Sequence, residues 1–120
     1  MRPSEGVLYA SVSQAMAVAQ QLRDADQLVE ISAVTDPDGL LGLPGMYASK
    51  VGYFDVALNV NGYVEVFPTS LDRDSRSSTL NRTRETDFEL GTVLVRVLTT
   101  NLSLAQTAKY DAAVNNLVLP

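Results

Sequence analysis

A run of glycine and proline before the middle of the chain constrains the fold most. Residues 36–45 contain three Gly and two Pro, a composition that the interior of a helix or of a strand does not tolerate. The run must therefore form an ordered turn that ends one regular element and leads into the next. Two acids, Asp36 and Asp38, open this turn, and Tyr47 follows it.

Hydrophobic periodicity predicts one helix before this turn and another near the end of the chain. Apolar residues recur at helical spacing over 11–24, and Ser11 with Gln14 matches a capping box. Ser103 likewise caps a helix that extends to about residue 117. The stripe that this last helix is expected to bury comprises Leu104, Ala105, Ala108, Ala112, Ala113 and Leu117.

A third predicted helix, from Thr69 to about residue 82, is strongly polar. Its apolar residues are Leu71 and Leu80, so we expect it to pack shallowly on the rest of the domain. Four arginines lie between residues 73 and 84, with Asp72 and Asp74 beside the first of them and Glu85 after the last. This pattern predicts a solvent-exposed face of mixed ion pairs.

Alternating β-forming residues predict strands over 28–35, 47–58, 63–67, 85–90 and 92–98. Asn61-Gly62 supplies a hairpin signal between the second and third of these strands, and Gly91 separates the last two. The final strand is apolar on both faces except at Arg96. A strand of this kind is central and covered on both sides, or it is covered on one side and lined on the other by long side chains.

These elements follow the order α-β-β-β-α-β-β-α in a single domain of 120 residues. Because hairpins connect most of the strands, the most economical architecture is an α+β two-layer domain. It has an antiparallel sheet of four to five strands with the helices mainly on one face. Residues 1–10 are expected to be flexible or peripheral.

Composition excludes several kinds of chemistry. The chain contains no His and no Cys, which removes thiol nucleophiles, Ser-His and Cys-His hydrolases, and the usual zinc sites. A net charge of −5 disfavours binding to nucleic acid, and no apolar run is long enough to span a membrane. No phosphate-binding glycine motif is present. We therefore expect neither enzymatic activity nor a cofactor.

The acids of the turn resemble the opening of a calcium-binding loop. However, Leu40 and Tyr47 occupy the positions where such a loop needs oxygen ligands. An Asx-type turn, in which the carboxylates of Asp36 and Asp38 accept hydrogen bonds from nearby backbone N–H groups, accounts for both acids. No metal site is therefore expected.

Strand alternation places Lys50, Glu65 and Arg96 on one face of the predicted sheet. If the register aligns them, they form a charged cluster, which is either a recognition patch or an ion-pair ladder on a solvated face. Together with the turn they define the candidate recognition surface: Asp36, Asp38, Tyr47, Lys50, Glu65 and Arg96.

Residues 35–51 resemble a group of small, uncharacterised actinobacterial proteins, many of which are made as lipoproteins. The motifs that carry the resemblance are Thr35-Asp36-Pro37-Asp38, Leu40-Leu41-Gly42, Pro44, Gly45, Tyr47 and Ser49-Lys50-Val51. The later segments 62–67, 93–97 and 102–110 are similar to that group's order of elements. Leu43 stands where that group has Arg, and Asp38 where Asn is usual. The resemblance implies an extracytoplasmic domain that a lipid tethers to the membrane in the full-length precursor, with no established activity.

We expect a non-catalytic binding or interaction domain of the cell envelope, whose partner is a protein or a small molecule. The alternative is a structural module that forms homo-oligomers or pairs with a different chain through the sheet face or the strand over 85–90. A carboxylate-based enzyme is the least favoured hypothesis. Cytoplasmic location is the alternative to an extracytoplasmic one, because residues 1–6 lack the apolar segment of a signal peptide.

Overall fold

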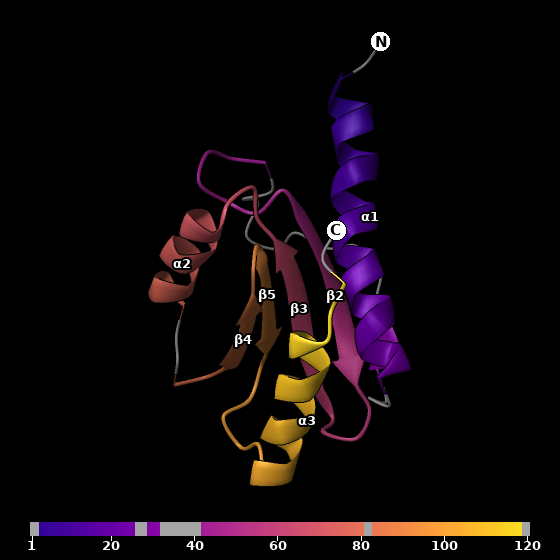
Figure 1. Cartoon of the computed structure of the whole chain (residues 1–120), viewed down its shortest axis with the longest axis vertical. Helices are drawn as coiled ribbons and strands as arrows, with labels where there is room; N and C mark the ends of the chain where they lie inside the picture. The colour runs from indigo at the N-terminus through magenta and orange to yellow at the C-terminus, as the bar shows by residue number, and fades with distance from the viewer. Residues whose placement is uncertain (1–2, 26–28, 32–41, 81–82, 119–120) are drawn as a thin grey trace.

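A computed structural model describes residues 3–25, 29–31, 42–80 and 83–118. Within these ranges the elements follow the predicted order (Figure 1). Their bounds are α1 (Pro3–Asp24), β1 (Val29–Ile31), β2 (Ser49–Asp55), β3 (Val60–Val66), α2 (Ser70–Thr79), β4 (Thr86–Leu90), β5 (Val93–Val97) and α3 (Leu104–Asn115).

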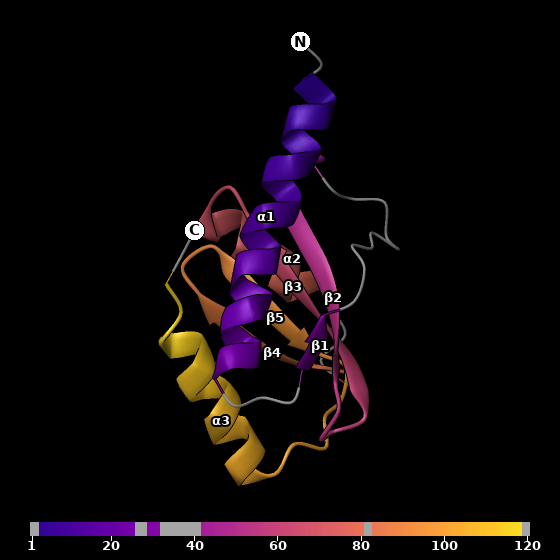
Figure 2. The ribbon, with the colours of Figure 1, turned by 90° about the vertical axis from the view of Figure 1, so that its right-hand side faces the viewer.

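The five described strands form one antiparallel sheet in the spatial order β1-β2-β3-β5-β4. Helices α1 and α3 cover one face of this sheet, and α2 lies over part of the opposite face (Figures 1 and 2). This arrangement confirms the predicted α+β fold with its helices mainly on one face. Strand β5 lies between β3 and β4 and is buried along its whole length, as its two apolar faces predicted.

The main hydrophobic core lies between the sheet and helices α1 and α3. Residues recurring at helical spacing give α1 a fully buried stripe, and the sheet meets this stripe with valines that alternate along the strands. The fully buried members of this core are Ala15, Val18, Ala19, Leu22, Val51, Val64, Val93, Val95 and Val97. A smaller core on the opposite face, which we call the second core, consists of Tyr47, Phe67 and Leu94, with Leu80 packed against it.

Helix α1 begins at Pro3, eight residues before the predicted start at Ser11. Proline is favoured at the first helical position because its fixed φ suits the helix and its missing N–H group needs no partner there. Ser11 and Gln14 therefore lie inside the helix, and the predicted capping box is wrong. The first turns of α1, in the segment expected to be flexible or peripheral, extend beyond the end of the sheet (Figures 1 and 2).

The hairpin between β2 and β3 also differs from the prediction. Its turn spans residues 56–59 and ends at Asn59, whose φ of 56° is left-handed, whereas Asn61 and Gly62 lie inside β3. Gly62 pairs with Tyr53 across the two strands. A Cβ atom at Gly62 would lie 2.3 Å from Cζ of Tyr53, so the glycine permits the close approach of an aromatic ring rather than a turn.

Helix α3 has the predicted capping box between Ser103 and Gln106. Its predicted buried stripe is largely wrong, since Leu104 is 92% exposed and Ala105, Ala108 and Ala112 are exposed as well. Ala113 and Leu117 are buried as predicted, and Tyr110 and Val114 complete the buried face. Alanine recurs on several sides of this helix, so the larger Tyr and Val side chains determine which face turns inward.

Candidate functional site

Glu65 of β3 lies at the centre of a group of charged side chains on the α2 side of the sheet. It is fully buried and pairs directly with Lys50 across β2 and β3, which places Nζ of Lys50 3.0 Å from Oε2 of Glu65. Arg96 of β5 lies diagonally across from Glu65, and its Nη1 donates a hydrogen bond of 3.0 Å to the same oxygen. The register thus brings together the three charged residues that were predicted to share a face.

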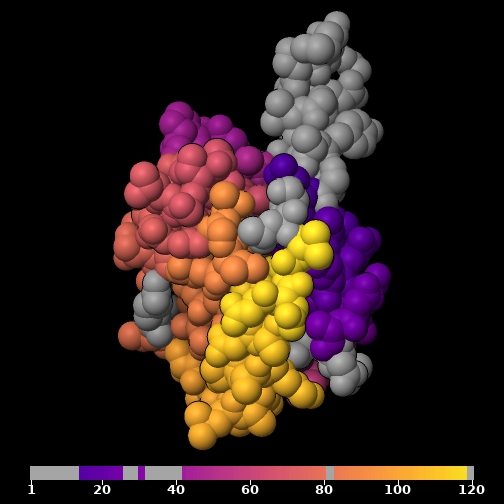
Figure 3. Space-filling view, in the orientation of Figure 1, coloured from indigo at the N-terminus to yellow at the C-terminus, as the bar shows by residue number. Residues whose placement is uncertain are grey.

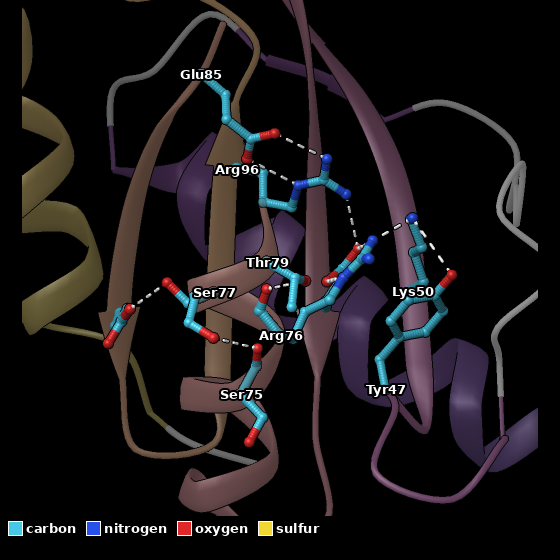
Figure 4. Close-up of polar contacts among 11 residues, drawn as sticks. Tyr47, Lys50, Ser75, Arg76, Ser77, Thr79, Glu85 and Arg96 are labelled. Carbon is cyan, nitrogen blue, oxygen red and sulfur yellow. Dashed lines mark hydrogen bonds and ion pairs between the residues drawn. The ribbon is translucent and has the colours of Figure 1, made fainter. Parts of the chain in front are cut away.

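A fourth member of the group comes from α2. Arg76 reaches down from the helix, and its Nε and Nη2 lie 3.2 and 3.3 Å from the two carboxylate oxygens of Glu65. Figure 4 shows Arg76, Arg96 and Lys50 pointing toward one another. The arginine-rich segment was predicted to be solvent-exposed, and this prediction is wrong for Arg76, which is buried.

Glu85, just before β4, completes the group by binding Arg96. The guanidinium donates from Nε and Nη2 to the two oxygens of Glu85, each at 2.9 Å, in the bidentate geometry that makes such pairs strong. Burial alone would raise the pKa of Glu85, but the hydrogen bonds that Arg96 donates hold it below the ordinary value. Burial would likewise lower the pKa of Arg96, yet the two carboxylates, Glu85 first, raise it. We call Lys50, Glu65, Arg76, Glu85 and Arg96 the charged cluster.

Aromatic rings line the charged cluster. Nζ of Lys50 lies 4.7 Å from the ring centroid of Tyr47 and 4.5 Å from that of Tyr63, and the guanidinium carbon of Arg96 lies 5.3 Å from the Tyr63 ring. Cations at this distance are attracted to the electron-rich faces of the rings. Tyr47 itself is fully buried and packs edge-to-face against Phe67 at 6.1 Å, so it joins the charged cluster to the second core.

The structure brings four of the six residues of the candidate recognition surface together. Tyr47, Lys50, Glu65 and Arg96 are in mutual contact, but all four are buried. Asp36 and Asp38 lie outside the described residues. A ligand at the surface therefore cannot reach the carboxylate of Glu65 while α2 is in place.

Both carboxylates of the charged cluster are paired with cations of the same chain. Glu65 receives donors from Lys50, Arg76 and Arg96, so its oxygens are occupied and cannot take a proton from a substrate. Among the described residues, no group of three or more acids is placed to hold a metal ion. No described helix is long and apolar enough to cross a membrane.

A second buried polar contact lies on the opposite face of the sheet, beneath α3. The Tyr110 hydroxyl donates to Oδ2 of Asp55 at 2.7 Å, and the Tyr53 hydroxyl donates to that of Tyr110 at 3.3 Å. Burial raises the pKa of both phenols above the ordinary value, so both remain protonated at neutral pH. They act as hydrogen-bond donors that anchor α3 to the sheet.

Sequence reasoning missed Arg76 and Glu85. A sequence signal for Arg76 exists, because positions 73, 76, 77 and 80 lie on one side of a helix. In the structure this side faces the sheet. Glu85 stands two residues before Asp87 and so shares its face of the strand. Neither signal shows which partner each residue meets.

Searches with protein-family models and against curated proteins and solved structures found no match to this chain.

Proposed function

We propose that this protein is a non-catalytic interaction domain that binds a protein or small-molecule partner at its surface. The observation that carries this proposal is the internal pairing of both acids of the charged cluster. Its acids, Glu65 and Glu85, bind arginines of the same chain, and these contacts stabilise the fold instead of facing a substrate. A carboxylate-based enzyme would need at least one of these acids accessible to a substrate.

The surface best suited to a partner is one end of the molecule, which we call the apolar end and define as Leu43, Pro44, Pro68 and Leu71. Leu43 is 49% exposed and Leu71 75% exposed, and both prolines are exposed. The turn that holds Leu43 contacts the first turn of α2, because a Cβ at Gly45 would lie 3.9 Å from Oδ1 of Asp72 (Figure 3). Exposed apolar residues gathered at one part of the surface are a common feature of interaction sites.

The setting that we propose is the cell envelope. The support is the resemblance of residues 35–51 to lipoprotein-like actinobacterial proteins, in which a lipid would tether the precursor outside the cytoplasm. Partition of the natural precursor into a detergent phase, together with incorporation of labelled fatty acid, tests this setting. A precursor that stays unlabelled in the aqueous phase of a cytosolic fraction would favour the cytoplasmic alternative.

Site-specific photocrosslinking tests the proposed partner surface. We would place a photoreactive amino acid at position 43, at position 71 or, as a control, at position 104, which is more exposed than either but lies on α3 at the other end of the molecule (Figure 1). The proposal expects one adduct of defined mass from positions 43 and 71 and none from 104. Identical adducts from all three positions, or none from 43 and 71, would contradict it.

The second candidate function is a structural module that pairs with another chain through β4. This strand is an edge of the described sheet. Its side chains at 87 and 89, with that of Glu85 just before it, are all acidic and share one face. When two β4 strands pair antiparallel about a two-fold axis, odd-numbered residues of one strand lie opposite odd-numbered residues of the other. Acids therefore face acids in every register. A heteromeric partner is therefore favoured over a homo-oligomer.

Light scattering at two widely separated protein concentrations tests this second candidate. A monomer at both concentrations would exclude self-pairing, and only pairing with a different chain would then remain for this candidate. Concentration-dependent dimers that Asp87→Lys abolishes would instead identify β4 as a homo-oligomeric interface.

A further inference from the structure

Helix α2 is attached to the sheet mainly by polar contacts. Arg76 and Ser77 are its buried residues, whereas Leu71 points into solvent. Besides the pairing of Arg76 with Glu65, the Ser77 hydroxyl donates to Oε1 of Glu89 at 3.0 Å. The helix thus rests on charged and hydroxyl groups along its inner side.

Two more contacts hold the first half of α2, and both involve Arg73. Its guanidinium pairs with Glu89 at 3.3 Å and donates to the carbonyl of Gly91 in the β4–β5 turn. The apolar contribution comes from Leu80, which follows the helix and packs partly buried against the second core. By comparison, α1 inserts Ala15, Val18, Ala19 and Leu22 fully into the main core.

These two kinds of attachment differ in strength. Burial of apolar side chains contributes free energy in proportion to the area removed from water. A buried ion pair contributes much less, since desolvation of its charges offsets most of their attraction, and a partly exposed pair contributes little. Helix α2 is therefore held more weakly than α1.

Withdrawal of Arg76 also leaves no unpaired charge in the sheet. Glu65 would keep Lys50 and Arg96 as partners, and Glu85 would keep Arg96. The guanidinium of Arg76 would return to water, where its charge is well solvated. The charged cluster can therefore lose its α2 member without the usual penalty for breaking a buried pair.

We propose that α2 is a lid that opens as a unit while the sheet, α1 and α3 remain folded. Opening uncovers the second core and the carboxylate of Glu65, together with the rings that flank Lys50. This inference goes beyond the proposed interaction at the apolar end and does not depend on it. It describes a local opening whose free energy is lower than that of global unfolding.

Thiol labelling tests the lid directly, because the chain contains no Cys and a single introduced thiol reports one position. Ser77→Cys places the reporter under α2, where Ser77 is 3% exposed, and Ala19→Cys places a matched reporter in the main core, where Ala19 is 0% exposed. Under native conditions we expect Ser77→Cys to react at least about tenfold faster, with a weaker dependence on urea. Equal rates with equal urea dependence would overturn the proposal.

Leu22→Ala, added to each reporter, tests whether the lid opens while the main core stays packed. Leu22 remains buried in the main core whether α2 is closed or open, so we expect the substitution to accelerate labelling at position 19 and to leave labelling at position 77 unchanged. An equal acceleration at both positions would mean that both thiols react through global unfolding, and the lid would be rejected.

Hydrogen exchange on the unmodified chain keeps the test independent of the Ser77 substitution. Once detached, a polar helix of ten residues unravels, so the amides of residues 74–80 are expected to exchange by local opening. Amides of β3 and β5 are expected to exchange only by global unfolding. Exchange of both sets with the same urea dependence would exclude the lid.

Discussion

The sheet face under α1 and α3 is packed with apolar side chains, whereas the face under α2 carries Glu65 surrounded by three cations. Both faces are buried, but by different means. Apolar packing is strong and tolerant of small shifts, whereas ion pairs require defined geometry and contribute little net free energy. We conclude that the α1 face supplies most of the stability, while the charged cluster positions α2 and pins the register of β2, β3 and β5.

The largest effect is expected on the charged face. Glu65→Ala removes the carboxylate that Lys50, Arg76 and Arg96 share. These buried cations then lose their common partner. The free energy of unfolding should fall by about 3–5 kcal/mol, measured by urea denaturation. Replacement of the inner residues together, as Glu65→Leu with Lys50→Met and Arg76→Met, should cost much less. A triple variant as unstable as Glu65→Ala would contradict our account of this face.

On the apolar face, Leu22→Ala is expected to lower the free energy of unfolding by about 2–5 kcal/mol, because it leaves a cavity in the main core. Leu104→Ala is the control, since that side chain is almost fully exposed, and should change stability by less than about 0.5 kcal/mol. Urea denaturation measures both variants. A small effect of Leu22→Ala would show that α1 is not the principal stabilising layer.

The hydrogen bond beneath α3 gives an intermediate effect. Tyr110→Phe deprives the buried Oδ2 of Asp55 of its donor and should cost about 1–3 kcal/mol. Tyr53→Phe removes only the longer bond to Tyr110 and should cost less. Thermal unfolding of the two variants ranks them, and the opposite order would show that the Tyr53 hydroxyl is the main anchor.

The smallest effect concerns pH. The pKa of Glu85 in the folded state lies below its ordinary value of 4.5, so its pairing with Arg96 stabilises the fold above that value. This contribution is lost as the pH falls through the lowered pKa. The stability difference between wild type and Glu85→Gln should therefore be present at neutral pH and disappear in acid. A difference that is constant across this range would refute the assignment.

Much of the fold could be predicted from the sequence because its signals are local. The valines of the final strand and the capping box at Ser103 each depend on a few neighbouring residues, and the structure contains the corresponding elements in order. Predictions from local signals failed where one sequence pattern is compatible with two different structures. Gly62 resembles a turn residue but provides space for Tyr53, and the alanines of α3 do not single out one buried face.

The candidate site divides in the same way. Alternation along strands was sufficient to place Lys50, Glu65 and Arg96 on one face. It could not show that a polar helix would cover them, because the inward direction of Arg76 depends on where the chain returns after β3. The recruitment of Glu85 likewise depends on the pairing of β4 with β5.

The order of the elements, the antiparallel sheet and the absence of thiol and imidazole chemistry follow from local propensity or composition, and so can be read from the sequence. Whether the shared charged face is open or covered depends on the tertiary arrangement. Burial of a charge is a property of the space around it, and residues far apart along the chain enclose that space. Helix α2 covers this face: it brings Arg76 onto Glu65, so that a predicted surface lies in the interior of the protein.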